Sequence, residues 1–165
     1  MFASSISVEV NPGDVSPMLT AEHVWLGLVR KAEDAAPFIP QVTACRVLDR
    51  TDGGLLREIT VRGQHRHERV TFTPPVQVYY KRVGSRDHAD WITNTISESE
   101  RGLLLTFTYF VDVPVGPDSF QDRWKHDEEL KNEFKNALTN TVDVIRSMVR
   151  DGQLSRGEEA SDCSR

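Results

Sequence analysis

Six strand-like runs follow one another between residues 42 and 113, and only short turns separate them. Turn-forming segments such as Asp52-Gly53-Gly54, Gly63-Gln64 and Pro74-Pro75 lie between the runs. Links this short cannot carry a crossover helix, so neighbouring strands are expected to pair antiparallel, as a meander. The runs are Val42–Asp49, Leu55–Arg62, His67–Thr73, Val76–Val83, Asp90–Ser97 and Leu103–Val113.

Three elements are predicted before the meander. Ser4–Val10 alternates apolar and polar residues, which is typical of a half-buried strand. Thr20 is a favourable N-cap for a helix that follows it. Ala35–Pro40 predicts a second, very short helix that proline ends. The residues expected to share the apolar face of the first helix are Trp25, Leu28, Val29 and Ala32.

One long amphipathic helix is predicted after the meander. Between Phe120 and Arg150 apolar residues recur at steps of three or four, and Gly152 is the predicted stop. The order of strand, two short helices, six strands and long helix predicts an α+β helix-grip fold: a seven-stranded, curved antiparallel sheet around a C-terminal helix, with an internal cavity. The competing fold, the cone of nuclear-transport-factor-like enzymes, places its helices mainly before the sheet.

The composition is that of one globular domain. Of the 165 residues, 38% are hydrophobic and 27% charged, and we expect a domain over 1–152 and a disordered polar tail over 153–165. The net charge of −5 argues against nucleic acid as a partner, and no apolar run reaches the roughly 20 residues of a membrane span. Cys45 and Cys163 fit neither a disulfide framework nor a zinc motif. With no secretory signal at the N-terminus, a cytoplasmic location is expected.

Strand parity divides the side chains of the meander between two faces. In the last strand the larger apolar set takes alternate positions from Leu103 to Val111, so this parity is expected to face inward. The same argument turns Arg57, Glu68 and Asn94 inward. The middle strand stays ambiguous, because both of its faces carry apolar residues. The predicted ligand-binding residues are Ile59, Val61, Val70, Phe72, Tyr80, Ile92, Phe107, Tyr109 and Trp124.

Arg57, Glu68 and Asn94 are the predicted catalytic residues. A cavity-facing arginine can hold a carbonyl, enolate or carboxylate oxygen, which Glu68 could protonate and Asn94 could also bind. Two alternatives stay open: an ordinary structural ion pair between Arg57 and Glu68, and exposure to solvent through a strand end or β-bulge. By the same parity, Glu58 and Arg69 are expected to form an outer pair.

The remaining chemistry-bearing residues are weaker candidates. His65 and His67 share one side of a strand, but a metal site needs a third ligand and supporting contacts, so no metal is expected. His126 on the long helix stays a weak candidate acid or base. The sequence has no phosphate-binding loop, nucleophile elbow or Cys/His dyad, so no cofactor is expected.

Several segments, taken in order, carry a family resemblance. They are LTAEHVWLGLVRKAEDAAPFIP, LLREITVRG with HERVTFTPPVQVYYKR, WITNTISESERGLLLTFTYFVDVP and TNTVDVIRSMV. Together they resemble the AtaL-like family, within the START and pollen-allergen-like (SRPBCC) superfamily of helix-grip proteins. The resemblance implies a cavity for an apolar ligand and natural-product chemistry, because some superfamily members are cofactor-free cyclases or aromatases. It supplies no catalytic residues.

The leading hypothesis is a cofactor-free cyclase or isomerase acting on an apolar, polyketide- or peptide-derived intermediate of secondary metabolism. The cavity would fix a reactive conformer of that intermediate. A non-catalytic carrier or sensor of a hydrophobic ligand is the second hypothesis, and a protein-interaction module with a collapsed cavity is the third. The expected partner is a hydrophobic small molecule, and self-association as a homodimer is left open.

Overall fold

A computed structural model describes residues 2–84, 91–111, 122, 124–125 and 128–154. Its two bounded helices are α1 (Ala21–Glu33) and α3 (Glu128–Arg150). Seven strands form one antiparallel sheet in the order β1-β7-β6-β5-β4-β3-β2, which confirms the predicted meander. The strands are β1 (Phe2–Glu9), β2 (Val42–Thr51), β3 (Gly54–Val61), β4 (Gln64–Thr73), β5 (Gln77–Val83), β6 (Trp91–Ser99) and β7 (Gly102–Val111).

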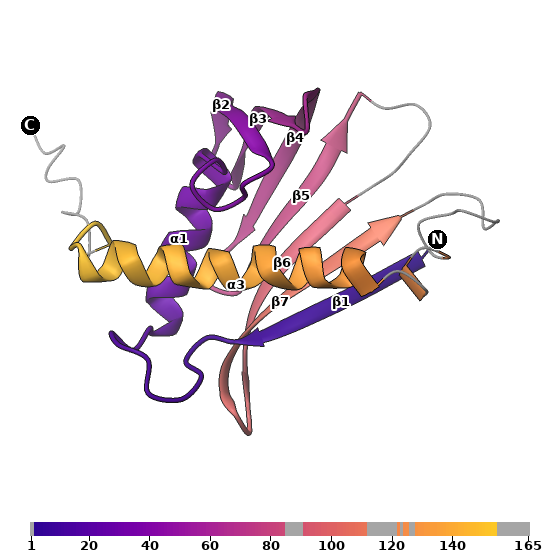
Figure 1. The fold of residues 1–165 in the computed structure, drawn as a ribbon. Coiled ribbons are helices and arrows are strands. Elements are labelled where there is room, and N and C mark those ends of the chain that lie inside the picture. The colour runs from indigo at the N-terminus through magenta and orange to yellow at the C-terminus, as the bar shows by residue number, and fades with distance from the viewer. Residues whose placement is uncertain (1, 85–90, 112–121, 123, 126–127, 155–165) are drawn as a thin grey trace, which may run out of the picture.

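Both helices lie on one face of the sheet, and Figure 1 shows α1 crossing the long helix α3. The first strand closes the arrangement, because β1 pairs with β7 from the far end of the meander. On the outer face of this pair, Ser5 bonds the Thr108 hydroxyl at 2.9 Å and Ser7 bonds that of Thr106 at 2.7 Å. The helix-grip fold is therefore confirmed, and no helix in the described ranges is long and apolar enough to cross a bilayer.

Helix α1 begins at a reciprocal cap. The Thr20 side chain accepts from the backbone N–H of His23 at 3.2 Å, and His23 Nδ1 accepts from the backbone N–H of Thr20 at 3.1 Å. Its buried face is turned by about one position from the predicted one. Trp25 and Val29 are only half-buried, whereas the fully buried residues are Val24, Gly27, Leu28, Lys31 and Ala32. Gly27 faces α3 so closely that a Cβ there would overlap the Ile145 side chain.

The predicted second short helix is wrong. Residues 35–40 form hydrogen-bonded turns, in which the N–H groups of Phe38 and Ile39 both donate to the carbonyl of Ala35. Two bonds to one carbonyl close a single turn, and Pro40 has no N–H to continue the pattern. The turn still buries Phe38, which is 1% exposed, in the core.

A two-residue turn sets the register of the β3–β4 hairpin. Arg62 (φ 52°) and Gly63 (φ 75°) both have positive φ, the requirement of a type I′ turn whose twist matches the flanking strands. Counting back from this turn places Arg57 directly opposite Glu68. A one-residue slip would send both side chains to the other face of the sheet.

Helix α3 ends at Gly152 as predicted. This glycine has φ 72°, its N–H donates to the Val149 carbonyl at 3.2 Å, and the N–H of Gln153 donates to that of Met148 at 2.8 Å. Leu154 then packs into the core at 5% exposed, so the predicted disordered tail does not begin before residue 155. Phe120, His126 and Cys163 lie outside the described residues.

Candidate functional site

A cavity of about 460 Å³ lies between the sheet and α3. It is within the range of about 300–1,000 Å³ that small-molecule sites occupy. Four residues of α3 line it, namely Glu133, Phe134, Ala137 and Leu138. The predicted site residues that line it are Arg57, Ile59, Val61, Glu68, Tyr80, Ile92, Asn94, Phe107 and Tyr109.

Three predicted ligand-binding residues do not line this cavity. Val70 is 1% exposed and lies in the core, and Phe72 packs edge-on against Trp25 with ring centroids 6.1 Å apart. The helix α1 covers this end of the strands, so inward parity there leads into packed core. Trp124 lies against Phe134 with the ring centroids 5.6 Å apart and is not among the lining residues.

Arg57 is held almost entirely by the protein itself. Its Nε and Nη2 donate to Glu68 Oε2 at 3.0 and 2.6 Å, and its Nη1 donates to the carbonyls of Lys31 and Ala32, both at 3.0 Å. Four of its five N–H donors are thus engaged. Burial disfavours the charge, but the Glu68 carboxylate outweighs this effect and keeps the pKa of Arg57 above its ordinary value. The guanidinium therefore caps the last turn of α1 and fixes the backbone of Lys31.

Glu68 is committed to its basic neighbours. Beyond the two bonds from Arg57, its Oε1 lies 3.6 Å from Arg66 Nε, which is an ion-pair distance and too long for a hydrogen bond. The side chains of Arg57 and Glu68 are 4% and 10% exposed. The pair is thus buried and faces the cavity, as parity predicted, and its role toward a substrate stays a prediction.

Lys31 is the main cavity residue that the sequence analysis missed. It is 7% exposed, and its Nζ donates to Asn94 Oδ1 at 3.1 Å and to Thr141 Oγ1 at 3.2 Å. Among the described residues no carboxylate forms an ion pair with it. Burial and the nearby Arg57 charge lower the pKa of Lys31 to about 7. The available signal was its spacing, because Lys31 follows Val24 and Leu28 on the apolar stripe of α1.

Tyr80 brings an unused hydroxyl to the same cavity. Its side chain is 5% exposed, its ring lies under the Arg57 guanidinium at 4.8 Å, and its hydroxyl has no hydrogen-bond partner in the described structure. Burial raises the pKa of Tyr80, so the hydroxyl keeps its proton. A buried donor without a partner is unusual, and a ligand oxygen would satisfy it. Val78 and Tyr80 are both buried, which settles the ambiguous strand parity.

Exposed residues mark the rim of the cavity. Arg62, at the β3–β4 turn, pairs with Glu133 on α3, and Gln41 Nε2 donates to the same carboxylate at 3.3 Å. All three line the cavity. These contacts tie the strand end and the turn before β2 to α3 across one edge of the opening.

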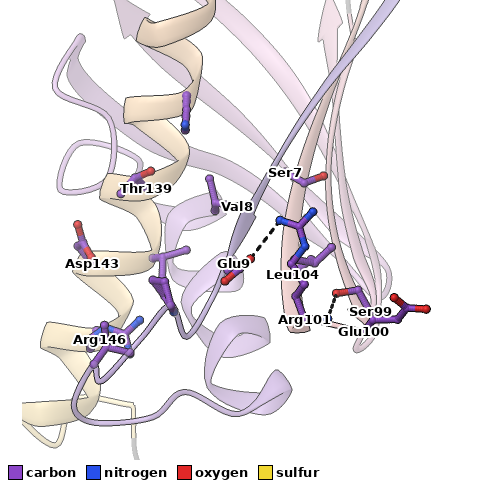
Figure 2. Close-up of a pocket in the computed structure, with 14 residues that line it drawn as sticks. Ser7, Val8, Glu9, Ser99, Glu100, Arg101, Leu104, Thr139, Asp143 and Arg146 are labelled. Atoms are coloured by element: carbon purple, nitrogen blue, oxygen red, sulfur yellow. Dashed lines mark hydrogen bonds and ion pairs between the residues drawn. The ribbon is translucent and has the colours of Figure 1, made fainter.

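A larger groove of about 710 Å³ lies on the outside, between β1, the β6–β7 turn and α3, as Figure 2 shows. Its charged groups hold the fold together. Arg101 pairs with Glu9 at 3.4 Å, and Arg146 donates to the carbonyls of Val10 and Pro17. The groove lacks a buried cluster of polar groups among its described residues, so the inner cavity is the candidate site.

The two histidines of the β4 strand lie apart from this site. His65 Nδ1 bonds the Thr60 hydroxyl at 2.8 Å, and His67 Nε2 lies 3.4 Å from Glu58 Oε2. Glu58 also pairs with Arg46 at 3.4 Å, so the expected partnership of Glu58 with Arg69 is wrong. Arg69 lies opposite Leu56 and Lys81 in the sheet. Across the described ranges, no group of three potential ligands could hold a metal ion.

Solved structures share the fold at low sequence identity. The di-domain ARO/CYC proteins BexL, of the BE-7585A biosynthetic pathway, and StfQ, of the steffimycin biosynthetic pathway, superpose with TM-scores of 0.62 and 0.64 at 10% identity. The matches cover 88% and 92% of this chain but 49% and 52% of theirs, so the chain spans about half their length. Ara h 8.0201 matches at 0.55 with 11% identity, covering 88% of this chain and 99% of its own.

No curated protein matches the sequence. The family described as acetylaranotin biosynthesis cluster protein L, or AtaL, matches residues 4–152, which include both edge strands, the cavity-lining strands and α3. Sheet order, helix placement and sequence thus agree, and the chain belongs to the AtaL family, with the helix-grip fold of the START and pollen-allergen-like superfamily.

Proposed function

We propose that this protein binds an apolar, carbonyl-bearing biosynthetic intermediate in the inner cavity and cyclises or isomerises it without a cofactor. The observation that carries the proposal is the convergence of Lys31, Asn94 and the Tyr80 hydroxyl, which has no partner among the described residues, within one cavity. The lining mixes apolar and aromatic side chains with polar ones, which suits a substrate that has a hydrocarbon skeleton and several oxygens. The biosynthetic family and the ARO/CYC fold neighbours support the same reaction class.

The cavity walls and polar groups would divide the work. The aromatic rings of Phe107, Tyr109 and Phe134 would fix a folded conformer of the substrate, which supplies orientation. Tyr80 and Asn94 would contact the oxygen on which charge develops. Arg57 and Glu68, whose polar atoms mostly bind each other and α1, would act as positioning residues.

A synthetic linear triketide thioester tests the proposal. We expect the protein to cyclise the thioester faster than buffer does, and chromatography of the product measures the rate. Tyr80→Phe should lower kcat about 100-fold, the size of effect typical of losing one charge-stabilising donor. Tyr79→Phe is the matched control, because Tyr79 neighbours Tyr80 on the other face of β5. Saturable binding of the thioester without any rate enhancement would overturn catalysis and leave a carrier.

A further inference from the structure

We propose that Lys31 is a nucleophilic amine that captures a ketone or aldehyde carbon of the bound molecule as an imine. The proposal rests on the proposed function only for the class of substrate. Its first support is the position of the Lys31 amine in the cavity. Lys31 lies in the last turn of α1 and lines the cavity. Arg57 Nη1 donates to its carbonyl oxygen at 3.0 Å, so the backbone of Lys31 is held in place.

The hydrogen-bond partners of Lys31 suit a neutral amine. The Thr141 hydroxyl donates to the Ala137 carbonyl at 2.9 Å, so its oxygen can only accept from Lys31, and Asn94 Oδ1 also only accepts. A neutral amine has two N–H groups and one lone pair. Its two donors match these two acceptors, and the lone pair stays available. An ammonium has a third N–H that neither partner accepts.

The surrounding charges favour the neutral form as well. The cavity holds two buried basic side chains, Lys31 and Arg57, and Glu68, the one buried carboxylate among the described residues, binds Arg57. The other titratable groups of the lining are Arg66, Tyr80 and Tyr109, with the Arg62–Glu133 pair at the rim. Burial first, and then the Arg57 charge, lower the pKa of Lys31 to about 7. A desolvated lysine beside a second cation is an activated amine.

The reaction balances without an oxidant or reductant. The Nζ lone pair forms the C–N bond while the carbonyl π electrons move to oxygen, and one proton then passes from the nitrogen to that oxygen, which gives a carbinolamine. A proton from solvent lets the oxygen leave as water, and the freed nitrogen lone pair forms the C=N bond of the protonated imine. The Tyr80 hydroxyl, which is buried and has no hydrogen-bond partner among the described residues, can donate a hydrogen bond to the oxygen during these steps. The protonated imine acidifies the neighbouring C–H, which generates the carbon nucleophile that a ring closure needs, and water later releases the amine.

Acetylacetone tests the proposal directly, because it traps reactive lysines as stable adducts. The wild-type protein should gain the mass of the probe minus one water, and a protease digest should locate the adduct on Lys31. Lys31→Met should abolish the adduct, whereas Lys81→Met, the same change at an exposed lysine of β5, should keep it. The adduct rate should fall about tenfold per pH unit below about 7, because only the neutral amine has a lone pair.

A second variant gives a readout independent of folding. Asn94→Asp places a carboxylate against the amine, so the pH at which labelling is half-maximal should shift upward, whatever the plateau rate at high pH becomes. Absence of an adduct on Lys31 in the wild type, or an adduct spread equally over exposed lysines, would overturn the proposal. If the triketide cyclises but Lys31 stays unlabelled, the imine fails and the proposed function stands. If Lys31 is labelled but nothing cyclises, the reactive amine stands and catalysis fails.

Discussion

At the scale of single residues, charge is arranged unevenly in the cavity. Glu68 neutralises Arg57 through two bonds at 3.0 and 2.6 Å, whereas the partners of Lys31 among the described residues are the neutral oxygens of Asn94 and Thr141. An unpaired buried charge costs several kcal/mol, so Lys31 loses its proton at a lower pH in the folded protein than it would in water. Folding stability must therefore depend on pH through Lys31.

Lys31 should make the protein more stable as the pH rises above neutrality. Its folded pKa is about 7 and its ordinary value is 10.5, so between these pH values the unfolded chain binds the extra proton. The free energy of unfolding should then rise by up to about 1.4 kcal/mol per pH unit in this window. Urea unfolding of the wild type and Lys31→Met at pH 7 and pH 9 measures the difference between the two. If the free energy of unfolding of the wild type, relative to that of Lys31→Met, does not increase from pH 7 to pH 9, the lowered pKa is contradicted.

The Arg57–Glu68 pair should be hard to break and easier to replace. Glu68→Gln leaves a buried guanidinium without its carboxylate and should lower the free energy of unfolding by about 3–5 kcal/mol. Arg57→Met with Glu68→Leu removes both charges and should cost less than the two single changes together. Glu58→Gln, on the exposed face of β3, is the control and should cost about 1 kcal/mol or less. Additive losses would show that the pair is not coupled.

At the scale of secondary-structure elements, one glycine sets how closely the helices cross. A Cβ on Gly27 of α1 would overlap the Ile145 side chain of α3, whose Cδ1 would lie 2.6 Å away. Ile145 itself is fully buried. The spacing of α1 and α3 thus depends on Gly27 having no side chain. The same spacing determines where Lys31 enters the cavity.

Gly27→Ala should destabilise the protein despite the better helix propensity of alanine. Overpacking costs about 1–3 kcal/mol, against roughly 1 kcal/mol gained from propensity. In an Ile145→Ala background the new methyl group fills vacated space, so the same change should be neutral or stabilising. Urea unfolding of the four proteins measures the coupling. An equal loss in both backgrounds would place the strain elsewhere.

The elements also show how far the sequence alone leads. The strand period of two is enough to place Arg57, Glu68 and Asn94 on the inner face, although the turn lies at Arg62-Gly63 and not at the predicted Gly63-Gln64. Parity could not tell cavity from packed core, because that depends on where α1 lies, and so Val70 was misplaced. Lys31 was missed because lysine on an apolar stripe normally reaches solvent. The Lys31 side chain does not reach solvent because α1 and α3 cross and cover it.

At the scale of the whole molecule, the sheet and α3 enclose a space that a ligand can stabilise. An anionic apolar dye such as anilinonaphthalene sulfonate combines rings for the aromatic wall with a negative charge for Arg66, whose Nε has no hydrogen-bond partner among the described residues. It should bind with a rise in fluorescence and, at a hundredfold excess over Kd, stabilise the fold by about 2.7 kcal/mol. Ala137→Phe fills the cavity and should abolish binding. Asn136→Phe, the exposed neighbour on α3, should not. Equal binding by both variants would place the dye outside the cavity.

The pairing of β1 with β7 has a consequence for how the protein is made. Ser5 bonds Thr108, which lies 103 positions later in the chain. The helix α3 follows all seven strands in sequence and therefore leaves the ribosome after them. Until that helix docks, the nascent sheet exposes its apolar inner face to water, and contacts this distant in sequence form slowly. The polar cluster around Arg57 remains hydrated during that interval. The cavity is thus the last part of the molecule to come into being, and the interval before α3 docks is when the chain is most open to aggregation or to binding by chaperones.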